Sequence, residues 1–179
     1  MVELKAQNQI KNEEKGVKLL ISMLLRYPII DLLDVDLTEN QIIFTFFLAN
    51  KDKANNESKK KLKLFKKSLN CFNQLEEINQ QEFSIKSTEY KQLFKIDLAY
   101  KVFCLTQKKL DFIIKLITEI FKKEIHLDKF NLAKNNSFES LDNLLTVIEA
   151  EQEKSYEFTY LAFREEDKIK VFNKANYMN

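Results

Sequence analysis

The chain has 179 residues, of which 45% are hydrophobic and 31% charged, and its formal net charge is +2. This length and composition fit a single domain, residues 1-179, with a sizeable core. No apolar run approaches the roughly 20 residues that a membrane-spanning helix needs, and Met1–Lys11 lacks the apolar centre of a signal peptide. These features predict a cytoplasmic protein without membrane insertion.

The scarcity of glycine excludes several nucleotide-binding and catalytic motifs. Gly16 is the single glycine of the chain, and phosphate-binding loops need glycine because their backbone must approach the ligand closely. The sequence therefore has no P-loop, dinucleotide-binding fingerprint or glycine-flanked nucleophile. Lysine outnumbers arginine 27 to 2, so bidentate recognition of phosphate has only Arg26 and Arg164 as candidates. We expect no cofactor.

Hydrophobic periodicity and turn residues predict helices that alternate with β-hairpins. In chain order we expect a helix over residues 13–27, strands over 33–37 and Gln41–Ala49, a helix over about Glu57–Gln80, strands over 83–86 and Gln92–Leu105, a helix over 107–121, a helix over about Phe138–Gln152, and a hairpin of Tyr156–Phe163 with 169–171. Pro28 ends the first helix, and Asn40 suits the positive φ of a tight turn. Met1–Lys11 is expected to be loose.

The stretch Gln92–Ile125 contains the centre of the predicted core. Alternation places six residues on one face of its strand: Phe94, Ile96, Leu98, Tyr100, Val102 and Cys104. Thr106 then offers an N-cap oxygen, and the apolar residues after it recur at helical spacing. We therefore expect Ile96, Leu98 and Ile117 to be buried together.

This order of elements predicts an α+β fold, with a mostly antiparallel sheet of about six strands, built from hairpins, and helices packed on it. The segment from strand Gln41–Ala49 to strand Tyr156–Phe163 also follows the β-α-β-β-α-β order of ferredoxin-like folds, on topology alone. Residues 137-173 form a C-terminal helix-plus-hairpin unit, which we interpret as part of the same domain or as semi-independent.

Most groups with reactive side chains fit structural or surface roles better than chemical ones. Cys71 and Cys104 both lie in apolar patterns, so we expect buried, reduced thiols. The other groups are Asp31 with Asp34 and Asp36, Glu76 with Glu77, His126 with Asp128, and Glu165 with Glu166 and Asp167. Two cysteines and one histidine do not complete a zinc site without carboxylates, and no glycine-turn loop accompanies the three aspartates to bind a hard cation. The histidine lacks an activated serine and an oxyanion hole. We expect no catalytic, cofactor-binding or metal-binding residues.

A run of lysines is the most prominent polar feature. It comprises Lys59, Lys60, Lys61, Lys63, Lys66 and Lys67. On a helix these residues cover the arc that the apolar stripe leaves free. They form either a solvated surface or a phosphate-binding face for nucleic acid or anionic lipid.

The strands predict a second apolar surface, which includes Phe47 and Phe103. Residues Lys51–Lys67 hold eight lysines against two acids, and Glu139–Asp167 hold nine acids against two basic residues. Opposite charges of this size can steer association, and an uncovered apolar sheet face needs a partner. We expect a homodimer through this face; alternatively, the helix Phe138–Gln152 and the N-terminal segment cover it within one chain.

These observations favour a non-catalytic macromolecular interaction or regulatory protein that binds a protein partner or itself. The alternative is a nucleic-acid-binding accessory protein that uses the Lys59–Lys67 helix face. An unrecognised enzyme is a third hypothesis. No motif identifies the pathway or the partner.

Overall fold

The computed structural model describes residues 14, 16–36, 38–49, 57–79, 81–90, 92–125, 159–165 and 168–174. In chain order these residues form a helix over 16–26, β1 (Leu32–Asp36), β2 (Gln41–Ala49), α2 (Glu57–Leu75), β3 (Phe83–Glu89), β4 (Leu93–Lys101), the 3-10 helix η1 (Val102–Cys104), α3 (Gln107–Ile120), β5 (Thr159–Glu165) and β6 (Lys168–Asn173). The expected helix Phe138–Gln152 and the segment Met1–Lys11 lie outside the described residues.

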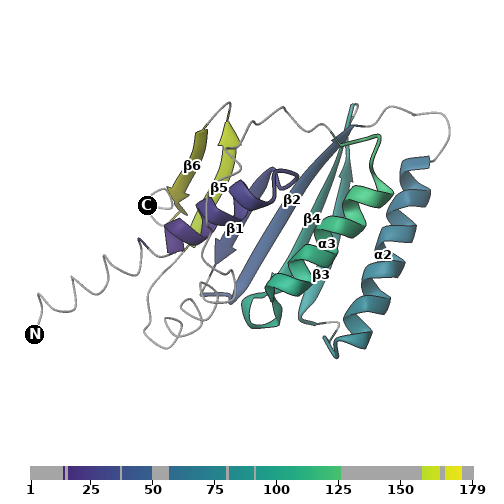
Figure 1. The fold of residues 1–179 in the computed structure, drawn as a ribbon, viewed down its shortest axis with the longest axis horizontal. Coiled ribbons are helices and arrows are strands. Elements are labelled where there is room, and N and C mark those ends of the chain that lie inside the picture. Colours follow the sequence, from purple (N-terminus) through teal and green to yellow (C-terminus); the bar gives the residue numbers. More distant parts are fainter. Residues whose placement is uncertain are drawn as a thin grey trace, which may run out of the picture.

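The strands form one sheet in the order β3-β4-β2-β1-β5-β6, and every neighbouring pair is antiparallel (Figure 1). Among the described residues, three α-helices pack on this sheet, so the predicted α+β class is confirmed. Strand β2 has the predicted bounds and lies between β1 and β4, so it is an interior strand of the sheet, as predicted.

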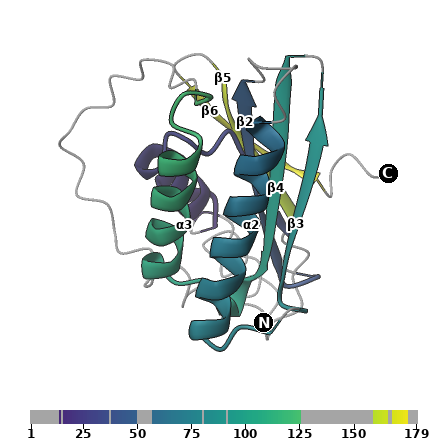
Figure 2. The ribbon, with the colours of Figure 1, turned by 90° about the vertical axis from the view of Figure 1, so that its right-hand side faces the viewer.

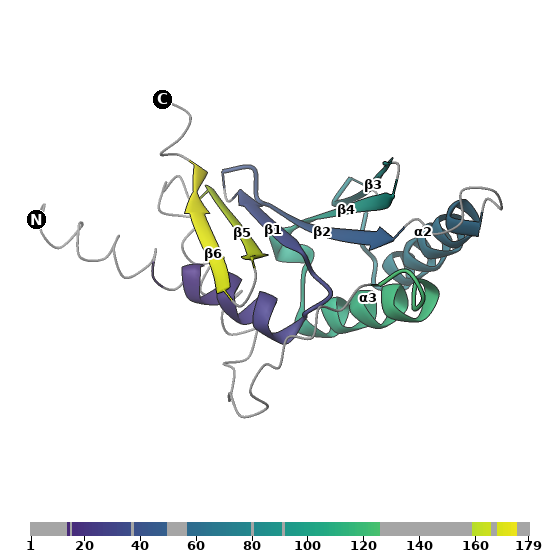
Figure 3. The same cartoon turned by 90° about the horizontal axis from the view of Figure 1, so that it is seen from above.

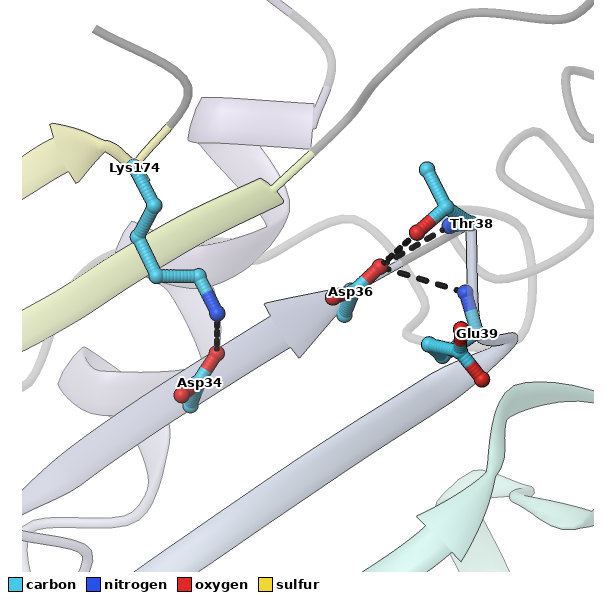
Figure 4. A network of polar contacts seen from close by, with 5 residues as sticks. All are labelled: Asp34, Asp36, Thr38, Glu39 and Lys174. Carbon is cyan, nitrogen blue, oxygen red and sulfur yellow. Dashed lines mark hydrogen bonds and ion pairs between the residues drawn. The ribbon is translucent and has the colours of Figure 1, made fainter. Parts of the chain in front are cut away.

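The turn between β1 and β2 is built from local hydrogen bonds. One carboxylate oxygen of Asp36 accepts hydrogen bonds from the Thr38 amide and hydroxyl and from the Glu39 amide, at 3.0, 2.5 and 3.1 Å (Figure 4). Asn40 has a φ of 51°, as predicted for this turn. These contacts favour pairing of the two strands that are adjacent in sequence.

The ferredoxin-like expectation holds for one half of the sheet and is wrong for the other. Strand β4 lies between β2 and β3, as in a split β-α-β unit. Strand β5, however, pairs with β1 and not with β2. The tight hairpin already places β1 along that edge of β2, so β5 can only add outside it.

Strand β4 ends earlier than the alternating pattern predicts. The last ladder partners are Lys101 with Gln41, and Tyr100 with Phe83, which are the first residues of the two neighbouring strands. Because no strand continues beyond these partners, Val102 leaves the ladder and starts η1. The expected strand over Gln92–Leu105 is therefore wrong at its C-terminal end.

The described helices, over residues 16–26, α2 and α3, lie on one face of the sheet (Figures 2 and 3). Phe94, Ile96, Leu98 and Tyr100 of β4 are buried beneath them, and Ile117 of α3 is fully buried in the same core. The predicted joint burial of Ile96, Leu98 and Ile117 is thus confirmed. The rings of Phe72 and Phe112 stack between α2 and α3, with their centroids 3.8 Å apart.

Helix ends follow local signals in part. Thr106 caps α3, since its hydroxyl accepts a 3.3 Å hydrogen bond from the Lys109 amide, as predicted. Helix α2 ends at Leu75, before the expected residue 80, and Glu77 just after it has a φ of 57°. A residue in the left-handed region commonly stops a helix. None of the described helices has the length and apolar character needed to cross a membrane.

Candidate functional site

The sheet face opposite the helices has no described helix on it, and we call it the open face (Figure 3). Strand register places directly paired residues on the same side. The open face therefore includes Ser84, Lys86 and Thr88 of β3; Leu93, Lys95, Asp97, Ala99 and Lys101 of β4; Gln41, Ile43, Thr45 and Phe47 of β2; and Leu32, Asp34 and Asp36 of β1.

Large apolar side chains are exposed at one end of the open face. Phe47 is 39% exposed and Leu93 is 42% exposed. They are diagonal neighbours, since Phe47 pairs with Lys95 and Leu93 lies two residues before it on β4. Exposed apolar residues that cluster on one face are typical of an interaction surface.

A hollow of about 210 Å³ lies beside this apolar end. Small residues contribute to its lining, namely Thr45, Ser84 and Ala99. Its volume is below the roughly 300–1,000 Å³ typical of small-molecule sites. The hollow is thus better suited to accept a side chain of a partner than a drug-sized ligand.

Charged groups of the open face form hydrogen bonds and ion pairs. Thr45 is 1% exposed, and its hydroxyl donates a 2.7 Å hydrogen bond to Asp97. Lys95 forms a 2.8 Å ion pair with the same carboxylate. On β1, Asp34 pairs with Lys174 at 2.5 Å (Figure 4). The face therefore carries ordered charges of both signs beside its apolar end.

Phe103 does not share a surface with Phe47. It is 53% exposed, as an interface residue would be, but it lies in η1 after the C-terminal end of β4. Phe47 pairs with Lys95 near the opposite end of that strand. The expectation that both phenylalanines belong to one sheet face is wrong because the strand stops at Lys101.

Within the described part of the chain, the lysine run divides into members that form ion pairs and members that do not. Lys59, Lys60, Lys63 and Lys67 are exposed on α2, and Lys66 is half-buried. Lys61 instead forms ion pairs with Glu57 at 3.2 Å and Glu124 at 2.5 Å. The hydrogen bond with Glu124 raises the pKa of Lys61, so this ammonium group is held charged within the protein. Lys61 is thus the least available of the six for phosphate.

Both arginines make contacts within the chain. The Arg164 guanidinium donates hydrogen bonds to the carbonyl oxygens of Leu24 and Pro28, where the helix over 16–26 ends. A cation at a helix C-terminus is favourable because it meets unpaired carbonyl groups there. Arg26 lies 5.6 Å from the ring centroid of Tyr27.

The two cysteines differ in environment, and the expectation that both are buried is wrong for Cys71. Cys71 is exposed on α2, while Cys104 is buried. The apolar neighbours of Cys71 in sequence do not bury it, because α2 packs through Phe65 and Leu69 instead. Burial, with a hydrogen bond to Glu82, raises the pKa of the Cys104 thiol to about 12. Cys104 is therefore a neutral thiol at neutral pH.

The remaining candidates do not converge on a chemical site within the described part of the chain. No group of three or more His, Cys, Asp or Glu residues there could hold a metal ion. Glu76 is half-buried, whereas Glu77 and Glu165 are exposed. His126, Asp128, Glu166 and Asp167 lie outside the described residues.

Alternation along the two strands β2 and β4 predicts that Phe47 and Leu93 belong to one second apolar surface, but it does not show which residues lie beside them. Leu93, Lys95 and Asp97 are signalled by the polar alternation of β4, yet only the register between β2 and β4 places them beside Phe47 and Thr45. No protein-family model matches the chain, and no match was found among curated proteins or solved structures.

Proposed function

We propose that this chain is a non-catalytic interaction protein that associates with a second copy of itself through the open face. The observation that supports this most directly is the exposure of Phe47 and Leu93 on a sheet face that bears no described helix. Burying apolar side chains of this size against a partner is favourable by about 25 cal/mol per Å².

The charges of the open face favour association with a specific partner over nonspecific association. The open face presents both signs, with Lys86 and Lys95 on the β3–β4 side and Asp34 and Asp36 on β1. A surface of mixed sign can complement itself, whereas a surface of one sign repels its own copy. We further propose a cytoplasmic location, since Cys71 and Cys104 are both free thiols.

Sedimentation velocity over a series of protein concentrations tests the proposal. We expect a dimer for the natural sequence, a monomer for Phe47→Asp, and an undisturbed dimer for Leu75→Asp. Leu75 is a matched control because it is 83% exposed but lies at the end of α2. A natural chain that stays monomeric at all concentrations, or a dimer unaffected by Phe47→Asp, would contradict the proposal. Persistence of the dimer in high salt would assign it to apolar contacts.

A second candidate function is binding of nucleic acid by α2. It is favoured by four exposed lysines, Lys59, Lys60, Lys63 and Lys67, none of which forms an ion pair with a described residue. Replacing Lys59, Lys60 and Lys63 with Gln should then weaken binding to duplex DNA and reduce its salt dependence by about one counterion for each phosphate that these lysines neutralise. Unchanged binding in that variant would exclude α2 as the surface that binds DNA.

A further inference from the structure

We infer that the two copies pack open face to open face about a two-fold axis that crosses the strands β2 and β4. This inference rests on the proposed function and specifies how the copies are oriented. The axis lies between the two sheets and is perpendicular to their strands. It passes between two neighbouring rows of side chains, of which one contains Phe47 and Lys95 and the next contains Thr45 and Asp97. The strands of the two copies then run antiparallel. The row with Phe47 and Lys95 in each copy lies over the row with Thr45 and Asp97 in the other copy.

Side-chain size on β2 and β4 supports this axis. The bulky exposed residues Phe47 and Leu93 lie on one side of it, and the small residues Thr45 and Ala99, which line the hollow, lie on the other side. The two-fold rotation places Phe47 over Thr45 of the second copy and Leu93 over its Ala99. Each copy thus fills the hollow of the other with its own bulky side chains, as an isologous interface requires.

Charge supports the same axis independently of size. Lys95 and Asp97 lie two residues apart on one face of β4 and form a 2.8 Å ion pair within the chain. The rotation brings Lys95 of each copy over Asp97 of the other. Face-to-face sheets are about 10 Å apart, a gap that an extended lysine and an aspartate can bridge together. Each Asp97 carboxylate would then lie between two ammonium groups.

An axis parallel to β2 fits less well. It would place Phe47 over Phe47 of the second copy and leave the hollow unfilled. It would also place Asp97 over Leu32, because β4 and β1 flank β2 on opposite sides. A carboxylate that is covered by an apolar side chain loses solvation without gaining a partner. Shape and charge therefore favour the axis that crosses the strands.

Charge-reversal variants mixed in solution test this orientation. Lys95→Asp alone places two carboxylates over two others, and Asp97→Lys alone places ammonium groups over ammonium groups. We expect each variant by itself to raise the dimer dissociation constant at least about tenfold. An equimolar mixture should sediment as a dimer again, because in the heterodimer every carboxylate at these two positions faces an ammonium group of the other variant. The intrachain ion pair is absent from both variants, so only contacts between copies explain recovery.

The controls separate this inference from the proposed function. Lys101→Asp changes the same face of the same strand but lies beyond the predicted overlap, so its dimer should persist. Circular dichroism establishes that the variants fold. The neutral variants Lys95→Gln and Asp97→Asn serve if a reversed charge prevents folding. Each should weaken the dimer, and their mixture should recover only part of the affinity, because the heterodimer regains one of the two contacts between Lys95 and Asp97. If Phe47→Asp abolishes the dimer while the Lys95→Asp and Asp97→Lys mixture stays monomeric, the orientation is wrong and the proposed function stands. A monomeric natural chain overturns both.

Discussion

Lys61 of α2 and Glu124, four residues after the end of α3, form a 2.5 Å ion pair. The same segment also joins the sheet, since the Glu124 carbonyl accepts a 2.8 Å hydrogen bond from the Ala49 amide and Ile125 forms a β-bridge with Leu48. This ion pair therefore connects two helices with the end of β2. It also shows that part of a lysine-rich helix serves the fold.

The two carboxylate partners of Lys61 should differ in their contribution to stability. Glu124→Ala removes a short hydrogen bond to a charged group in a half-buried site, which costs about 1.5–3 kcal/mol. Glu57→Ala removes a more exposed pair within α2, which costs about 0.2–1 kcal/mol. Urea unfolding of both variants measures the difference. Equal losses would mean that the link to α3 adds nothing beyond a surface ion pair.

The core prediction concerns one residue from the sheet and one from the helix that covers it. Leu98 and Ile117 are fully buried, so Leu98→Ala and Ile117→Ala should each lower the free energy of unfolding by about 2–5 kcal/mol. Leu75→Ala is the control, because its side chain is largely exposed, and it should change stability by less than about 0.5 kcal/mol. Near-zero shifts in the denaturation midpoint for both core variants would refute the assigned core.

The two thiols should react at very different rates. Cys71 is exposed and Cys104 is buried with a raised pKa of about 12, and the thiolate is the reactive form. In the native protein an aromatic disulfide reagent should modify Cys71 quickly and Cys104 only after unfolding. Cys71→Ser should abolish the fast phase, while Cys104→Ala should preserve it. Two fast thiols in the folded chain would contradict the burial of Cys104.

The Asp36 turn should make stability depend on pH in the acid range. Burial alone would raise the pKa of Asp36, but hydrogen bonds from Thr38 and Glu39, with the Lys174 charge, outweigh burial and lower it from 3.8. The ionised carboxylate therefore stabilises the fold above the pKa of the unfolded chain, and this contribution disappears as the pH falls through the lower folded-state value.

Asp36→Ala tests this dependence. It should cost about 1 kcal/mol at neutral pH and progressively less in acid, where the natural chain loses the same contribution. Asp36→Asn is the matched control, since its amide still accepts hydrogen bonds but does not titrate near this pH. Thermal unfolding followed from neutral to acid pH measures the difference. A cost for Asp36→Ala that is constant with pH would show that the turn does not depend on the ionised carboxylate.

The sequence by itself determined the features that depend on neighbouring residues. Asn40 and the alternation after it predict the turn and the bounds of β2, and Thr106 predicts the start of α3, because turns, strands and caps are set within a few residues. The buried face of β4 followed from its period of two. The sequence also predicted that Phe47 belongs to a second apolar surface, because apolar residues of β2 lie on both faces of the strand.

Only the tertiary structure decided features that need a distant partner. The end of β4 at Lys101 depends on where β2 and β3 begin, and the place of β5 depends on β1 already occupying the edge of β2. The pairing of Lys61 with Glu124 and the exposure of Cys71 depend on which side of α2 meets the core. Strand register alone brings Lys95 and Asp97 beside Phe47 and Thr45, because periodicity assigns a residue to a face but cannot say which strand lies next to it.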